Sequence, residues 1–112
     1  MTITQNYNEG QWTIALEGRL DANTSPELEE TVKCGPENME ILILDLEGMN
    51  YVSSAGLRVI LQALKKMKKA GKAMKVVNVS DQVFEVFELT GFVDILDIER
   101  AQIRPGSEGD LE

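Results

Sequence analysis

The sequence predicts a single α/β domain with a mixed β-sheet and helices packed mainly on one face. Three observations predict this class: apolar and polar residues alternate near the N-terminus, an almost continuous apolar run spans 40–46, and a helical repeat spans 57–67. The chain has 112 residues, which suits one hydrophobic core. The expected order is strand, strand, helix, strand, helix, strand, helix, strand. Right-handed crossovers make the later strands parallel, whereas the opening hairpin is antiparallel.

The first two strands form a predicted hairpin. Ile3, Gln5 and Tyr7 alternate with polar neighbours before a Gly-containing turn at 8–10, and a second alternation places three apolar residues on one face: Trp12, Ile14 and Leu16. A short helix then begins at 24–27, where a hydroxyl residue and a proline suit its first turn. It buries Leu28 and Val32, and Gly35-Pro36 ends it.

The central strand is predicted at 40–46, followed by a turn at 48–50. The second helix extends from about Ala55 to Ala70, because apolar residues recur there on one helical face: Leu57, Ile60, Leu61, Leu64 and Met67. Gly71 is placed to end this helix in a left-handed conformation. Basic residues cluster from Lys65 to Lys75, in the last turns of this helix and just after it, where they oppose the negative end of the helix dipole and indicate a solvated face.

The remaining elements are a strand at 74–79, a third helix and a short last strand. Ser80-Asp81 caps the helix, whose buried stripe is Val83, Val86 and Phe87 and which ends at Gly91. The last strand is expected within 92–98, with Val93, Ile95 and Leu96 as its inward positions. The folded domain should therefore span 1–99. The few apolar residues at 100–112 predict a flexible acidic tail.

Composition excludes several classes of function. The formal net charge of −8 disfavours nucleic acid and anionic lipid as partners. No apolar run is long enough to cross a bilayer and no signal peptide is evident, so a cytoplasmic location is expected. The chain has no histidine, no metal-ligand cluster and no phosphate-binding glycine loop, which argues against an enzyme, a metal or a cofactor. Cys34 is expected to be a buried or half-buried structural thiol, and Asp45 and Glu47 are expected to face solvent.

The segment that joins the central strand to the second helix is the candidate site. Ser54 is the expected N-cap of that helix, and Gly56 allows another chain to approach its first turn closely. A phosphate on Ser54 would lie beside the positive end of the helix dipole, so the fold would tolerate it. Helix starts often carry serine, however, and the residues by themselves favour an ordinary helix cap at Ser53-Ser54 without any regulation.

The chain resembles the STAS domain family, named for sulfate transporters and anti-sigma factor antagonists, over roughly residues 2–98. Gly18-Arg19-Leu20-Asp21 is similar to the family's Gly-x-Leu-Asp, and Ser54-Ala55-Gly56-Leu57 follows Val52-Ser53 as in the stand-alone bacterial antagonists. The resemblance implies that an anti-sigma factor with serine kinase activity phosphorylates Ser54 and that a PP2C-type phosphatase reverses this. Only the unphosphorylated protein would bind the anti-sigma factor and release a sigma factor. The implied partner-binding residues are Asp21, Asn23, Ser53, Ala55, Gly56, Leu57 and Arg58.

Two departures from the family pattern leave alternatives open. Ser53 stands where the best-known pattern has Asp, and Ala55 replaces a second hydroxyl residue, so Ser53 is a second candidate for phosphorylation. Asp21 either fixes a turn or also contacts the kinase. A different reading is a STAS adaptor subunit without a phosphate cycle, docked on a lipid-transport ATPase or a signalling scaffold.

Overall fold

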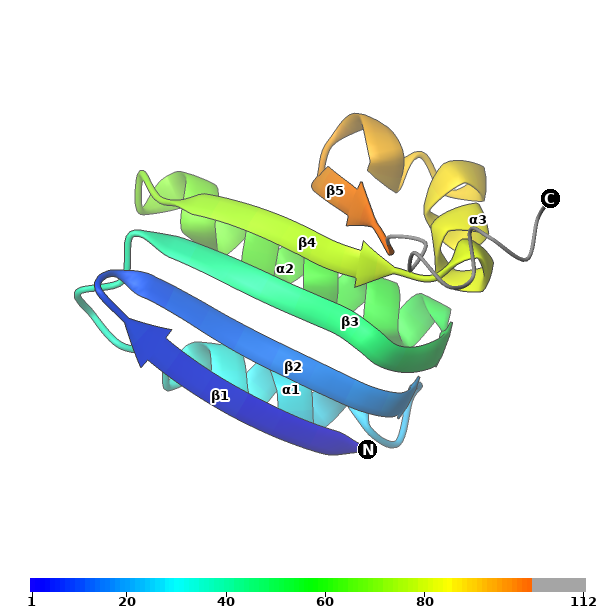
Figure 1. The fold of residues 1–112 in the computed structure, drawn as a ribbon, viewed down its shortest axis with the longest axis horizontal. Coiled ribbons are helices and arrows are strands. Elements are labelled where there is room, and N and C mark those ends of the chain that lie inside the picture. Colours follow the sequence, from blue (N-terminus) through cyan, green and yellow to red (C-terminus); the bar gives the residue numbers. More distant parts are fainter. Residues whose placement is uncertain (102–112) are drawn as a thin grey trace, which may run out of the picture.

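The computed structural model describes residues 1–101 and contains the predicted elements in the predicted order (Figure 1). Within that range the strands are β1 (Thr2–Asn8), β2 (Gln11–Leu20), β3 (Ile41–Val52), β4 (Ala73–Val79) and β5 (Asp97–Arg100). The helices are α1 (Ser25–Lys33), α2 (Ser54–Lys69), α3 (Asp81–Leu89) and a short 3-10 helix, η1 (Phe92–Asp94). The predicted flexible tail lies, apart from its first two residues, outside the described residues.

The strands form one mixed sheet in the order β1-β2-β3-β4-β5. β1 is antiparallel to β2, and every later neighbour pair is parallel, as predicted. Glu9 and Gly10 both have positive φ, 48° and 86°, which identifies the tight two-residue turn typical of hairpins. Figure 1 shows α1 and α2 behind the sheet, so the predicted one-sided packing is confirmed. Neither of these two helices covers the opposite face of the sheet (Figure 1).

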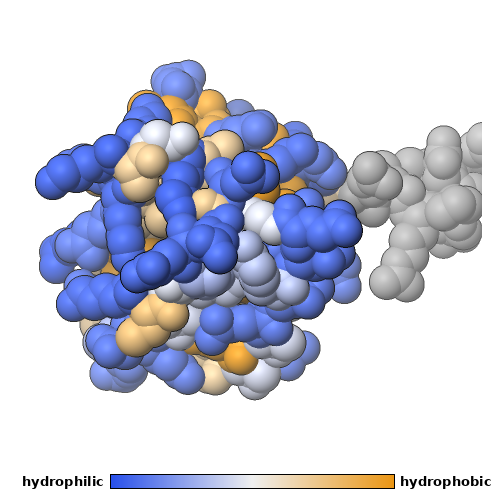
Figure 2. All heavy atoms as spheres, turned by 90° about the vertical axis from the view of Figure 1, so that its left-hand side faces the viewer, coloured by the Kyte–Doolittle hydropathy of each residue, from blue (hydrophilic) through white to orange (hydrophobic). Residues whose placement is uncertain are grey.

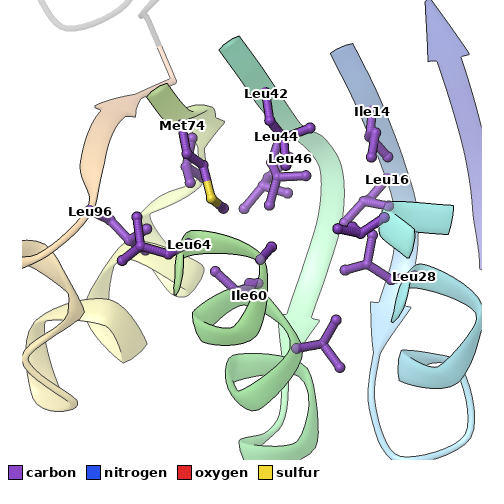
Figure 3. Packing of buried hydrophobic residues seen from close by; sticks show 14 of the residues in the cluster. Ile14, Leu16, Leu28, Leu42, Leu44, Leu46, Ile60, Leu64, Met74 and Leu96 are labelled. Atoms are coloured by element: carbon purple, nitrogen blue, oxygen red, sulfur yellow. The ribbon is translucent and has the colours of Figure 1, made fainter. Parts of the chain in front are cut away.

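Most of the core lies between the sheet and these two helices, and the buried residues Val83 and Phe87 of α3 extend it. Alternate residues of β2, β3 and β4 point toward the helices, and the predicted apolar stripe of α2 meets them (Figure 3). The predicted inward residues of β2 and α1 are all buried: Trp12, Ile14, Leu16, Leu28 and Val32. At its far end α2 closes as predicted, because Gly71 has a φ of 72° and the Lys72 N–H donates to Met67 O at 2.8 Å.

β3 is longer than predicted, and this changes the shape of the site. The prediction of a turn at 48–50 is wrong, because β3 continues to Val52 and stays paired with β2 over this stretch. Irregularities in the β2–β3 register allow this, since Glu17 pairs with Gly48 and Arg19 pairs with Tyr51. The central strand therefore enters α2 through a single connecting residue, Ser53.

Other predictions are also corrected. Cys34 is exposed rather than buried, because it lies at the C-cap of α1, beyond the buried stripe of that helix. Asp45 is half-buried rather than fully solvated, and its Oδ1 accepts from Asn78 Nδ2 at 3.0 Å; Glu47 is exposed as expected. In the last segment Ile95 is 44% exposed and Leu96 is buried, because η1 turns the chain before β5 begins.

None of the helices in the described range combines the length and the apolarity needed to cross a bilayer. Figure 2 views the end of the molecule at which the β1–β2 turn lies and shows mostly hydrophilic residues there.

Candidate functional site

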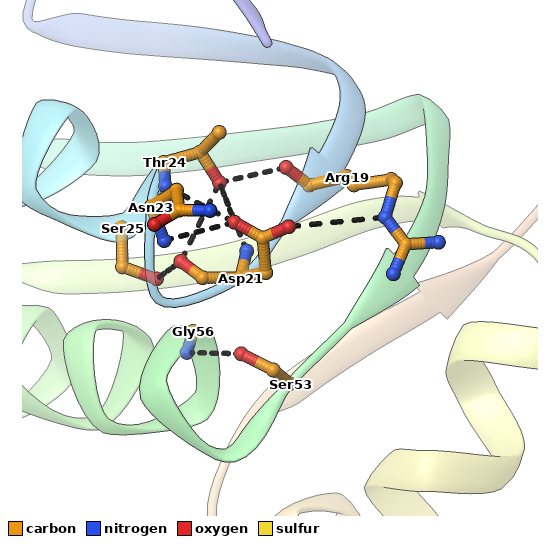
Figure 4. Close-up of polar contacts among 7 residues, drawn as sticks. All are labelled: Arg19, Asp21, Asn23, Thr24, Ser25, Ser53 and Gly56. Carbon is orange, nitrogen blue, oxygen red and sulfur yellow. Dashed lines mark hydrogen bonds and ion pairs between the residues drawn. The ribbon is translucent and has the colours of Figure 1, made fainter.

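The two segments singled out in the sequence meet at the carboxyl ends of β2 and β3. Leu20 pairs with Val52 across these strands, and the Ser53 N–H donates to Leu20 O at 2.9 Å. Figure 4 shows the loop after β2 lying directly beside the first turn of α2. The candidate residues therefore lie together at the end of the sheet where open α/β sheets usually present their functional surfaces.

Ser53, not Ser54, caps α2. The Ser53 backbone is extended, and its Oγ accepts from the Gly56 N–H at 3.3 Å. The predicted cap was one residue too late, because β3 runs further than expected and leaves Ser53 as the last non-helical residue. Ser54 is the first residue of the helix and is exposed. No hydrogen bond joins its hydroxyl to any other residue of the described range 1–101.

Gly56 makes room for the protein's own chain rather than for a partner. It is buried, and a Cβ at this position would lie 2.7 Å from Leu20 Cγ and 2.9 Å from Leu20 O. Leu57 is only 9% exposed and belongs to the core. These two residues therefore hold α2 against the end of β2 and offer little surface. Ala55 is half-buried, and Arg58 is exposed one turn after Ser54.

The loop after β2 is built around Asp21. Its Oδ1 accepts from the N–H groups of Asn23 at 3.0 Å and Thr24 at 3.2 Å, which closes an Asx-type turn (Figure 4). Thr24 is the N-cap residue of α1, but its hydroxyl donates to Arg19 O at 2.7 Å and does not cap the helix. Asp21 thus has the turn-forming role that the sequence left open. Asn23 is exposed at the tip of this loop.

The pKa of Asp21 reflects the same hydrogen bonds. Partial burial raises the pKa of this carboxyl, but the N–H donors of Asn23 and Thr24 and the Thr24 hydroxyl act in the opposite direction. Arg19, whose Nε lies 3.8 Å from Asp21 Oδ2, lowers it further. The net result is a pKa below the ordinary value for aspartate, so Asp21 is a carboxylate at neutral pH.

Sequence analysis missed one feature of the site, a stack between Arg19 and Tyr51. The Arg19 guanidinium lies 4.0 Å from the centre of the Tyr51 ring, and Tyr51 is 40% exposed. These residues become neighbours only through the irregular β2–β3 register. No local pattern in the sequence signals that contact.

The chemistry of the site is that of a surface hydroxyl beside a helix N-terminus. The positive end of the α2 dipole favours an anion there. Among residues 1–101 no cluster of histidine, cysteine or acidic side chains could hold a metal ion. An exposed hydroxyl in this position could carry an added anionic group.

Comparison with known proteins gives the family. A model of the STAS domain matches residues 3–105, and this chain therefore belongs to the STAS domain family. No curated protein matches the sequence.

Among solved structures, an anti-sigma factor antagonist from Mycobacterium paratuberculosis is similar at a TM-score of 0.79 and 21% identity, covering 88% of this chain and 84% of that one. The phosphorylated form of SpoIIAA from Bacillus is similar at a TM-score of 0.70 and 13% identity, and the match covers 99% of this chain and 100% of that one. A sulfate transporter family protein from Wolinella succinogenes is similar at a TM-score of 0.74 and 16% identity, and the match covers 80% of this chain and 76% of that one. At such identities these likenesses show a shared fold.

Proposed function

We propose that this chain is an anti-sigma factor antagonist and that phosphorylation of Ser54 switches off its binding to an anti-sigma factor. The observation that carries the proposal is the Ser54 hydroxyl, which is exposed on the first turn of α2 and has no hydrogen bond within the described range. A kinase active site can reach such a hydroxyl without unfolding the domain. The resemblance to stand-alone STAS antagonists supports an anti-sigma factor as the partner.

Ser54 is a better phosphate acceptor than Ser53 for a structural reason. The Ser53 Oγ is the cap of α2, and Ser53 is half-buried. Phosphorylation of Ser53 would disturb this capping hydrogen bond, which contributes about 1 kcal/mol to the stability of the fold. Phosphorylation of Ser54 would break no described hydrogen bond and would place the new charge beside the positive end of the helix.

The switch acts on the surface and leaves the fold intact. A phosphate adds roughly −1.5 to −2 charges at neutral pH, and Arg58, one turn further along α2, is placed to pair with it. The proposed partner surface consists of exposed or half-exposed residues around Ser54: Asp21, Asn23, Ser53, Ala55 and Arg58. An anti-sigma factor that packs on this surface would have to desolvate the dianion, and binding would be lost.

The decisive experiment incubates the purified protein with the kinase-type anti-sigma factor encoded near it and ATP, followed by intact-mass measurement and peptide mapping. We expect one added phosphate, located on Ser54 and removed by a PP2C-type phosphatase. Ser54→Ala should abolish the mass gain, whereas Ser53→Ala, the matched control, should retain it. Binding without any mass gain would instead identify a STAS adaptor subunit.

A binding measurement tests the second half of the proposal. Ser54→Ala should bind the anti-sigma factor persistently in the presence of ATP, and Ser54→Asp should bind it much more weakly. Equal affinities for the two variants would rule out the switch. The protein would act in the cytoplasm as a binding module, with neither an enzymatic activity nor a cofactor of its own, and without nucleic acid or membrane as partners.

A further inference from the structure

β1 forms an unprotected edge of the sheet. It pairs with β2 on one side, and no other strand within residues 1–101 pairs with its outer side (Figure 1). Edge strands are usually protected from pairing with other chains by charged residues, proline or a bulge. The seven residues of β1, Thr-Ile-Thr-Gln-Asn-Tyr-Asn, include no charge and no proline, and their register with β2 is unbroken. None of the chain's 30 charged residues (19 acidic and 11 basic) lies in β1, so no side-chain charge on this strand opposes pairing with another strand.

The hairpin turn determines which backbone groups of β1 point outward. Asn8 and Gln11 flank the two-residue turn and form its hydrogen-bonded closing pair. Hydrogen-bonded and non-hydrogen-bonded pairs alternate along an antiparallel ladder. The N–H and C=O groups that point away from β2 are therefore those of alternate residues: Ile3, Gln5 and Tyr7.

We propose that two copies of this protein pair antiparallel through β1, about a two-fold axis at Gln5, to form one continuous sheet. In this register Gln5 lies opposite the second copy's Gln5, and Ile3 lies opposite the second copy's Tyr7. These are the same residues whose backbone groups are free, so every outward N–H and C=O of the strand finds a partner. Any other register would leave some of them unpaired.

The side chains support the same register. Ile3 and Tyr7 lie on the helix-facing side of β1, since they pair with the buried Leu16 and Trp12. Tyr7 is 43% exposed, and contact with the second copy's Ile3 would cover part of its ring. Such aromatic and β-branched pairs stabilise sheets by about 0.2–1 kcal/mol each.

Gln5 is suited to the position on the axis. Its side-chain Oε1 accepts from Trp12 Nε1 at 3.2 Å within its own copy, which holds the side chain away from the edge. The proposed contact leaves Ser54 free, because β3, which leads into α2, is two strands away, about 10 Å from β1. Each copy carries a net charge of −8, so mutual repulsion opposes the pairing and salt should strengthen it.

Site-specific cross-linking of the full chain tests this register. In a Cys34→Ser background, Gln5→Cys places two thiols on residues whose Cα atoms would lie about 5.5 Å apart, within disulfide range. Thr2→Cys is the matched control, since Thr2 lies opposite the second copy's Asn8 and the two copies of residue 2 would be about 20 Å apart. Circular dichroism of each reduced variant checks that it is folded.

We expect Gln5→Cys to form disulfide-linked dimers about tenfold faster than Thr2→Cys under mild oxidation. Sedimentation of the unaltered chain should show a dimer fraction that rises with protein and salt concentration. Equal cross-linking rates for the two variants would refute the proposal. A monomer at every concentration would also refute the proposal, and the β1 edge would then be available for pairing with a strand of a different protein.

Discussion

Gly56→Ala adds one methyl group where the first turn of α2 meets the end of β2. The new Cβ would lie 2.7 Å from Leu20 Cγ, 2.9 Å from Leu20 Cδ2 and 2.9 Å from Leu20 O. A rotamer change of Leu20 relieves only the side-chain contacts, because the carbonyl belongs to the β2 backbone. Overpacking of this kind lowers the free energy of unfolding by about 1–3 kcal/mol, and the higher helix propensity of alanine offsets at most about 1 kcal/mol of that loss. We expect a net destabilisation of about 1–2 kcal/mol, or roughly 5–15 °C in Tm.

Urea unfolding measures this loss directly, because the single tryptophan, Trp12, is buried in the core and its fluorescence reports unfolding. A double-mutant cycle with Leu20→Ala identifies the cause. Removing the Leu20 side chain removes two of the three close contacts, so Gly56→Ala should cost less in that background, by about 0.5 kcal/mol or more. A Gly56→Ala variant as stable as the parent, or an equal cost in both backgrounds, would refute this interpretation of the site.

Three further predictions concern the same region and its surroundings. Ser53→Ala removes the cap of α2 and should lower the free energy of unfolding by about 1 kcal/mol, whereas Ser54→Ala should change it by less than about 0.5 kcal/mol; similar losses would contradict the assigned cap. The pKa of Asp21 is lowered in the folded state, so its ionised form stabilises the fold above the unfolded pKa of about 4, and this contribution is lost as the pH falls through the folded pKa. The stability difference between the parent and Asp21→Asn should therefore be constant near neutral pH and shrink in acid, and urea titrations that show no such change would argue against the Asp21 turn. Cys34 is exposed and should react with a thiol reagent in the native protein, before unfolding; protection until unfolding would contradict its position at the end of α1.

Local patterns in the sequence determined most of the fold. The repeat from Leu57 to Met67 defined α2 and its buried face, and Gly71 marked its end, because helix formation and capping depend on residues within a few positions of each other. The alternation through Trp12, Ile14 and Leu16 likewise defined the buried face of β2. The meeting of the two candidate segments followed as well, since the carboxyl ends of parallel strands lie at one edge of the sheet.

Contacts between residues distant in sequence decided the details of the site. Because β3 pairs with β2 as far as Val52, the strand continues where a turn was expected at 48–50. The N-cap of α2 is therefore Ser53 and not Ser54. The same pairing brought Arg19 against Tyr51 and Leu20 against Gly56. Strand register is determined by the hydrogen bonds and packing of both partners together, and a single strand's sequence carries only half of that information. The sequence therefore located the serine pair, whereas the folded sheet determined which hydroxyl caps the helix and which one remains exposed.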